Sequence, residues 1–456
     1  MAKAYQLIQA QTLTGTTASV TFSNIPQNFT DLKILFSTRS DNGSVPQTDL
    51  RFTFNGVGGT SYQEKILYTT NGTSVASYGV SNYAYFNWGS NASTANTANT
   101  FSNGEIYIPN YTSTNNKSTS IDVVVENNGT AADVHFACGL FTTSSAITSI
   151  TLYAGGGNLV SGSTFYLFGI GGARATGGTI TADSYYTYHT FTSSGTFTAF
   201  ENINNAEALV IAGGGGGGSG DNANIGAGGG GGGGVAYIWG KKLTAGTSYS
   251  AIIGSGGSGG TFASGNGVSG SNGNNSFFAD VTAVGGGYGA TVPAAGGSGG
   301  SGGGAGGGLS ASGGSATQTT PTGGIGYGNA GGNNTGYTGA GGGGGGAGVA
   351  GSIALSNSGG KGGNGTSLFT YWGLATSTGE SSNGVYYYAG GGGGAGYGST
   401  GNGEAGLGGA TSGKNGGSAS NATANTGGGG GGASGTTARS GGTGGSGLVI
   451  IRYPNT

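Results

Sequence analysis

Long runs of glycine without a Gly-X-Y period constrain the fold of this chain more than any other feature. They occupy residues 213–218, 228–234, 341–346, 390–394 and 427–432. The chain holds 114 Gly but only 6 Pro. A collagen triple helix needs glycine at every third position and abundant proline, so collagen is excluded.

A flexible linker is also disfavoured. The runs alternate with segments suited to packing, such as 235–239 and 277–281, and the chain closes on the apolar segment 448–453. Only 6% of residues are charged, too few to hold a solvated coil extended by repulsion. The glycine runs are therefore predicted to be ordered.

Polyglycine can form a polyproline-II helix with about three residues per turn and no internal hydrogen bonds. Its N–H and C=O groups then need partners in neighbouring helices. Only glycine lets backbones approach closely enough, and its large loss of conformational entropy requires nearly complete lateral bonding. The runs predict a packed polyglycine-II sandwich.

An ordered succession of segments resembles the glycine-rich domain of bacteriophage tail-fibre proteins. The segments are 208–216, 235–238, 243–254, 275–278, 282–287 and 445–454, so the resemblance extends from about Tyr185 to the end. The glycine runs are similar to those of T-even phage adhesins, which carry their receptor specificity in the loops between polyglycine helices. This resemblance implies a virion protein. The first residues lack the apolar stretch of a signal peptide, so the chain is expected to be made in the host cytoplasm.

Residues 1–170 read as all-β. Short segments rich in branched and aromatic residues recur at 20–22, 32–37, 51–55, 105–109, 121–126, 132–138, 147–153 and 163–170. These eight or nine predicted strands, with no helix, indicate a jelly-roll-like β-sandwich. Residues 171–183 are predicted to be a linker, and 184–456 the glycine-rich domain.

Within that domain, residues 185–192 and 195–200 predict a β-hairpin. The apolar segments 209–212 and 448–452 are expected to lie together as a base, with the intervening loops on one distal face. Aromatic residues gather in two of these loops, and single tyrosines lie beside glycine runs. The predicted receptor-binding residues are Phe369, Tyr371, Trp372, Tyr386, Tyr387, Tyr388 and Tyr397, because stiff amphipathic rings suit recognition. The alternative is that these rings form a small core at the edge of the bundle.

No catalytic residue, metal site or cofactor is predicted. Residues 408–414 approach a phosphate-binding loop, but Asn415 replaces the required Ser or Thr. His135 and His189 lack visible partners, and Cys138 reads as a buried structural thiol. Glu380 and Glu404 lie near the aromatic loops, where a sugar-cleaving pair is much less expected than hydrogen bonding to sugar hydroxyls.

The sequence thus predicts a non-enzymatic tail fibre or adhesin. Its N-terminal sandwich would attach to other virion proteins, and its loops would bind a host surface protein or polysaccharide. The alternative is a capsid decoration or head-fibre protein. The net charge of −2 offers no footprint for nucleic acid, and no segment is long and apolar enough to span a membrane. The oligomeric state stays open between a single chain and a homotrimer.

Overall fold

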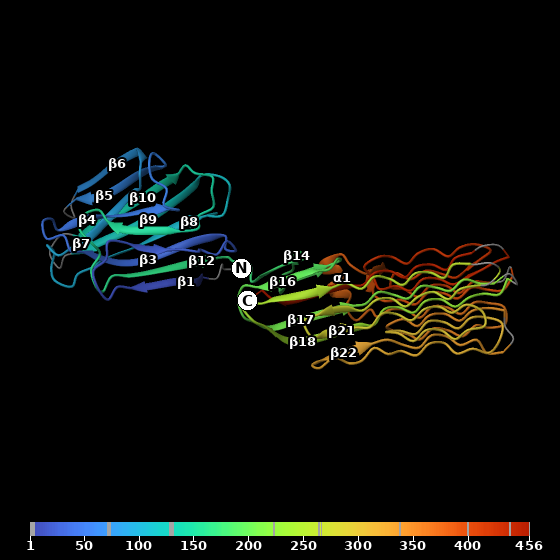
Figure 1. Cartoon of the computed structure of the whole chain (residues 1–456). Helices are drawn as coiled ribbons and strands as arrows, with labels where there is room; N and C mark the ends of the chain where they lie inside the picture. Colours follow the sequence, from blue (N-terminus) through green and yellow to red (C-terminus); the bar gives the residue numbers. More distant parts are fainter. Residues whose placement is uncertain are drawn as a thin grey trace. The chain divides into compact units, whose positions relative to one another are not determined.

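The computed structural model describes residues 5–70, 74–126, 132–221, 224–262, 265, 267–336, 339–398, 401–436 and 439–455 (Figure 1). The chain divides into two compact units, Met1–Ala173 and Arg174–Thr456. We call them the N-terminal unit and the glycine-rich unit. Each has a hydrophobic core of its own.

The larger layer of the N-terminal unit is an antiparallel run of strands in the order β1-β12-β3-β8-β9-β10-β5-β6. Their bounds are β1 (Tyr5–Thr12), β12 (Thr164–Ile170), β3 (Asp31–Ser40), β8 (Ser102–Pro109), β9 (Lys117–Glu126), β10 (Ala132–Phe141), β5 (Tyr62–Thr70) and β6 (Ser74–Tyr83). Buried and exposed residues alternate along β3 and β8, as they do when one face of a strand covers a core.

The smaller layer has the order β2-β11-β4-β7, with bounds β2 (Val20–Phe22), β11 (Ile150–Ala154), β4 (Gln47–Phe54) and β7 (Phe86–Ser93). The end of β3 pairs in parallel with β7 and joins the two layers. Between them lies one core, in which the rings of Phe52 and Phe86 are 4.8 Å apart. The predicted all-β class and β-sandwich are confirmed.

The N-terminal unit has more strands than its sequence pattern predicts. The additional ones are β1, β5, β6 and β7, and β6 and β7 are rich in Ser, Asn and Gly. Such sequences carry little strand propensity of their own. Pairing decides their conformation instead, because β5 and β6 extend the ladder of β10.

The base of the glycine-rich unit consists of two sheets around a shared core. One has the order β14-β15-β27-β17-β18-β22, the other β13-β16-β19-β20-β21. The bounds are β13 (Ala175–Thr176), β14 (Thr179–Ala182), β15 (Tyr186–Phe191), β16 (Gly195–Ala199), β17 (Ile203–Ile211), β18 (Val235–Leu243), β19 (Ser248–Ile252), β20 (Ser276–Phe278), β21 (Val281–Ala283), β22 (Gly324–Tyr327) and β27 (Leu448–Pro454). One short helix and two short strand pairs complete the described part of the unit. They are α1 (Thr370–Thr376) beside the hairpin β23 (Glu380–Ser382) and β24 (Val385–Tyr387), and the parallel pair β25 (Lys414–Asn415) and β26 (Ala433–Ser434).

The expectation for the base is confirmed in one respect and wrong in another. The apolar strands β17 and β27 pair directly, with Leu209 opposite Ile450. The predicted hairpin of 185–192 and 195–200 does not form, because β15 pairs with β14 and β27 whereas β16 pairs with β13 and β19. Residues 171–183, predicted to be a linker, contain β13 and β14 of these sheets.

The glycine runs extend from the base as a bundle of parallel and antiparallel segments (Figure 1). Along residues 213–219, hydrogen bonds from successive residues go to three different neighbours in turn. Gly213 and Gly216 donate to Asn274 and Ser271, Gly214 and Gly217 to Gly445 and Gly442, and Gly215 and Gly218 to Gly231 and Gly228, at 2.8–3.1 Å. This repeat of three matches a polyproline-II helix whose three faces each contact another helix. The packed polyglycine-II arrangement is thereby confirmed.

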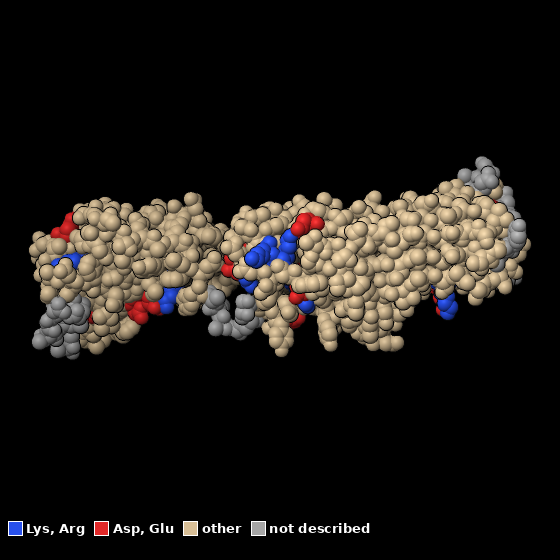
Figure 2. All heavy atoms as spheres, turned by 90° about the horizontal axis from the view of Figure 1, so that it is seen from below, with Lys and Arg blue, Asp and Glu red and all other residues tan. Residues whose placement is uncertain are grey.

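The spacing of the segments explains the composition. A Cβ atom added at Gly215, Gly230 or Gly344 would lie closer than 3.0 Å to a backbone carbonyl oxygen of a neighbouring segment. No side chain fits there without moving the backbone. Charged side chains are few on the face drawn in Figure 2. Hydrogen bonds between backbones hold the bundle together.

Candidate functional site

Six of the seven predicted receptor-binding residues belong to one excursion of the chain, residues 366–388, which we call the aromatic insertion. Thr366 and Tyr388 close it with two backbone hydrogen bonds of 3.0 and 3.1 Å. It contains α1, β23 and β24. α1 lies beside the base sheets rather than at the far end of the glycine runs (Figure 1). The expectation that these loops lie on a distal face is therefore wrong for this insertion.

Three residues of the insertion are core residues. Phe369, Trp372 and Tyr388 expose 5%, 3% and 0% of their surface and pack against Leu209, Val235 and Ile450 of the base. The Tyr388 hydroxyl contacts the Thr378 hydroxyl at 2.8 Å, and burial raises the pKa of Tyr388 to about 12. A receptor cannot reach these side chains while the unit is folded, so the prediction is corrected in favour of its alternative, a small core.

Arg452 of β27 joins the insertion to the base sheet. Its guanidinium lies 4.1 Å from the centre of the Tyr186 ring and 4.4 Å from the centre of the Trp372 ring. It also forms an ion pair of 2.8 Å with Glu207, and both side chains are about 15% exposed. Tyr237 donates a hydrogen bond of 2.6 Å to the same carboxylate; burial and this carboxylate raise the pKa of Tyr237.

The outer side of the insertion remains open. Leu368, Tyr371 and Leu374 expose 68%, 79% and 64% of their surface, and we call them the α1 surface. Tyr371 and Leu374 are three residues apart on α1 and share one of its faces. Tyr386 and Tyr387 of β24 are half-buried. A Cβ atom at Gly373 would collide with Tyr386, so this helix packs closely on the hairpin.

Tyr397 lies elsewhere, at the far end of the bundle. Its N–H donates to Asn357 at 2.9 Å, and the next residue, Gly398, donates to Asn224. These contacts join three turns that reverse the glycine segments. Leu309 and Leu355 lie in turns at the same end of the bundle. Gly307 donates to Gly226, and Leu355 and Ser358 bond to each other across the turn that contains Asn357.

Leu309, Leu355 and Tyr397, which we call the distal surface, expose 48%, 65% and 39% of their surface. Glycine periodicity does not mark Leu309 and Leu355, and sequence reasoning missed both. The signal that reveals them is a leucine within a stretch of mostly small residues, Gly, Ser and Ala around Leu309 and Ser, Ala and Asn around Leu355.

The residues considered for catalysis have other partners. Glu380 accepts hydrogen bonds of 2.5 and 2.6 Å from the N–H groups of Gly408 and Gly409, and Glu404 pairs with Lys361 at 2.7 Å. His189 is fully buried between the Gly177 carbonyl and the Tyr453 hydroxyl. Each group thus contributes to local structure.

His135 contacts the Ser90 hydroxyl at 2.9 Å, and burial lowers the pKa of its imidazole. Within the described residues, no carboxylate hydrogen bond orients its ring, as a catalytic triad requires. Over the same residues, no cluster of three or more His, Cys, Asp or Glu side chains could hold a metal ion, and no helix is long and apolar enough to cross a membrane. Cys138, expected to be buried, is exposed on β10.

Comparison with known proteins bears on the glycine-rich unit. No curated protein matched the chain. A family model described as glycine-rich domain matches residues 190–454, more than half of the 456 residues. The match begins within β15 and ends at the last residue of β27, so it spans the base sheets and the polyglycine bundle together. The chain therefore belongs to the glycine-rich domain family.

Proposed function

We propose that this protein is a phage virion protein, a tail fibre or adhesin, that attaches to the host surface through the distal surface of its glycine-rich unit. The observation that carries the proposal is that the bundle bonds to itself through its backbone. Gly230 shows this: its N–H donates to Gly430, and its carbonyl accepts from Gly392, both at 2.8 Å. The turns at the far end therefore contribute little to the stability of the bundle.

A bundle held together by its backbone, with turns that contribute little to its stability, suits a recognition surface. Turns on a rigid scaffold tolerate changes of sequence and carry binding residues. The distal surface exposes two leucines and a tyrosine among small polar residues, and apolar side chains of this size supply contact area for a protein loop or for the C–H face of a sugar. A single small surface binds weakly, and several copies on one particle raise the avidity greatly.

In this proposal the N-terminal unit contacts other virion proteins. The host ligand is an outer-surface protein or polysaccharide. The α1 surface is another exposed apolar group of the unit, but it lies at the base. A fibre that presents its far end to a cell would bind through the distal surface. Changes to the distal surface should therefore reduce binding to host cells, whereas changes to the α1 surface should not.

The experiment compares binding of three full-length proteins to host bacteria by flow cytometry. They are the natural protein, a distal variant (Leu309→Ser, Leu355→Ser and Tyr397→Ser) and a matched α1 variant (Leu368→Ser, Tyr371→Ser and Leu374→Ser). All six side chains are exposed, so circular dichroism and melting temperature should remain unchanged. We expect saturable binding that the distal variant loses by about tenfold or more and the α1 variant keeps.

Loss of binding in the α1 variant alone would move the receptor site to the base and contradict the distal assignment. If the folded natural protein binds no host cell, while antibody labelling of particles finds it on the capsid, the protein is a decoration or head-fibre protein instead.

A further inference from the structure

The outward face of the larger sheet in the N-terminal unit carries an unusual mixture of side chains. One row of cross-strand neighbours crosses this face through Tyr166, Leu35, Glu105, Asp122, Phe136 and Leu67. Phe136, Leu67 and Leu35 are 55%, 49% and 37% exposed. A sheet face that meets only water ordinarily carries polar side chains, so this row indicates a surface with a partner.

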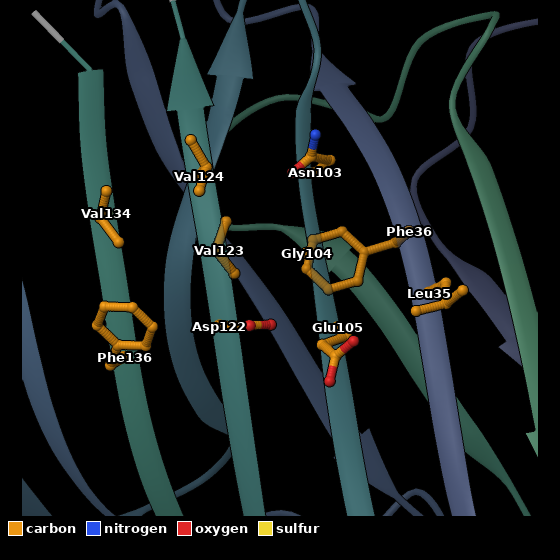
Figure 3. A pocket seen from close by; sticks show the side chains of 10 residues that line it. All are labelled: Leu35, Phe36, Asn103, Gly104, Glu105, Asp122, Val123, Val124, Val134 and Phe136. Atoms are coloured by element: carbon orange, nitrogen blue, oxygen red, sulfur yellow. The ribbon is translucent and has the colours of Figure 1, made fainter.

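The centre of the row is a shallow depression of about 410 Å³ on strands β10, β9, β8 and β3 (Figure 3). Its size is within the range of small-ligand sites. Phe136 and Val124 border it on one side and Leu35 on the other. Asp122 and Glu105 lie between them, and their side chains are neighbours across the two strands (Figure 3).

The two carboxylates select the kind of ligand. Glu105 is paired with Lys33 at 2.6 Å, whereas the carboxylate of Asp122 has no hydrogen bond or ion pair to any residue that the structure describes. A purely apolar partner would remove water from both carboxylates without supplying donors, which is costly. The ligand must therefore offer hydrogen-bond donors beside an apolar surface.

Charge disfavours an ionic ligand. Of the described residues, two carboxylates and no lysine line the depression, so an anion would be repelled there. Lys33 and Lys65 lie on the same face outside the depression, so an extended cationic segment would meet them. Asp31 of this face is buried and accepts a hydrogen bond from Tyr107. An uncharged ligand that combines C–H groups with hydroxyl donors satisfies the whole depression.

We propose that this depression binds a neutral sugar unit of a surface glycan. The C–H face of a pyranose ring would lie on the Phe136 ring, and its hydroxyls would donate to Asp122 and to the oxygen of Glu105 not engaged by Lys33. Asn103, which lines the same depression, supplies both a donor and an acceptor. This site is separate from the distal surface and does not rest on the adhesin proposal.

The test uses the full-length protein and an array of immobilised neutral oligosaccharides built from hexose, deoxyhexose and N-acetylhexosamine units. Binding by at least one glycan is expected, and Phe136→Ala and Asp122→Asn should each weaken it by about tenfold, or about 1.4 kcal/mol. Val75→Ala is the matched control, because Val75 is 69% exposed on β6 of the same sheet and does not line the depression. The control should bind like the natural protein.

Cys138 gives an independent readout. It is the only cysteine of the chain, it is exposed, and it is two residues from Phe136 on the same face of β10. A bound glycan should slow the alkylation of Cys138 in the natural protein but not in Phe136→Ala. Circular dichroism checks that the two proteins have the same fold. Absence of binding to every glycan, equal binding by Phe136→Ala, or slowed alkylation only with a purified virion protein would overturn the proposal. The last result would show that a protein covers the face.

Discussion

The guanidinium of Arg452 lies 4.4 Å from the centre of the Trp372 ring, which joins the C-terminal strand to a helix 80 residues earlier in the chain. Arg452 is also held by Glu207 of β17. The cation–π contact with Arg452 and the burial of Phe369, Trp372 and Tyr388 therefore hold the aromatic insertion against the base sheet. This contact explains why residues with the composition of a recognition loop form part of the interior.

Arg452→Ala should lower the free energy of unfolding of the glycine-rich unit by about 3 kcal/mol. The change leaves Glu207 buried with Tyr237 as its remaining donor. It also removes the guanidinium that contacts both the Tyr186 and the Trp372 ring. Urea denaturation followed by tryptophan fluorescence measures the effect. Lys361→Ala is the control: its ion pair with Glu404 is 67% and 73% exposed, so its loss should cost less than about 0.5 kcal/mol. Equal effects of the two substitutions would contradict the assigned role of Arg452.

Trp372→Ala and Tyr371→Ala should differ strongly although the residues are adjacent. Trp372 is 3% exposed and its truncation should cost about 3–5 kcal/mol. Tyr371 is 79% exposed and its truncation should change stability by no more than about 0.5 kcal/mol. Thermal melts of the two variants check the difference, and a destabilised Tyr371→Ala protein would show that the α1 surface is covered.

Gly230→Ala should destabilise the bundle by about 3 kcal/mol or prevent its folding. The new Cβ would collide with the carbonyl of Gly215, and backbones that hydrogen-bond on three sides cannot separate without breaking bonds. Gly401→Ala is the matched control, because its Cβ would meet only the Ser358 hydroxyl, at an ordinary 3.7 Å. Differential scanning calorimetry compares them. A tolerated alanine at 230 would mean that the segments are less closely packed in solution.

Stability of the glycine-rich unit should fall as the pH decreases below about 6.5. His189 donates from Nδ1 to the Gly177 carbonyl, and its Nε2 accepts from the Tyr453 hydroxyl, so a second proton would displace that donor. Burial lowers the pKa of His189 in the folded protein. The unfolded chain therefore takes up the proton first, and stability is present above the unfolded pKa and lost below it.

The slope should approach about 1.4 kcal/mol per pH unit between the unfolded and the folded pKa. His189→Gln removes the titrating group while keeping a side chain that can hydrogen-bond. The difference in unfolding free energy between the natural protein and this variant, measured from pH 7.5 to 5, should therefore shrink as the pH falls. A difference independent of pH would show that His189 is not buried in its neutral form.

Much of the architecture followed from local chemistry. Apolar alternation indicated the β-sandwich through strands such as β3 and β8, and the apolar segments 209–212 and 448–452 indicated the paired strands β17 and β27. The strands β6 and β7 escaped detection because Ser, Asn and Gly adopt many conformations and only their neighbours make them extended. The short helix α1 contains a glycine and a tryptophan and has no capping side chain, so no local signal marks it.

The candidate sites show the same division. Sequence reasoning identified aromatic residues as unusual in a glycine-rich environment, which is correct, but exposure cannot be read from residue type. Trp372 and Tyr371 are neighbours with opposite environments, and the face of α1 that meets Arg452 decides between them. Likewise, the row from Leu35 to Phe136 joins residues about 100 positions apart, and only strand register brings Asp122 beside Glu105.

The sequence by itself determined that the glycine runs pack, because no other residue allows backbones to approach so closely and no isolated polyglycine helix satisfies its own hydrogen bonds. The tertiary structure alone decided which segments become neighbours. Gly213, Gly214 and Gly215 are chemically identical, yet they bond to Asn274, Gly445 and Gly231. A chain of equal residues carries no local preference among partners, so the turns and the base sheets set the order of the bundle and, with it, the side chains that reach its far end.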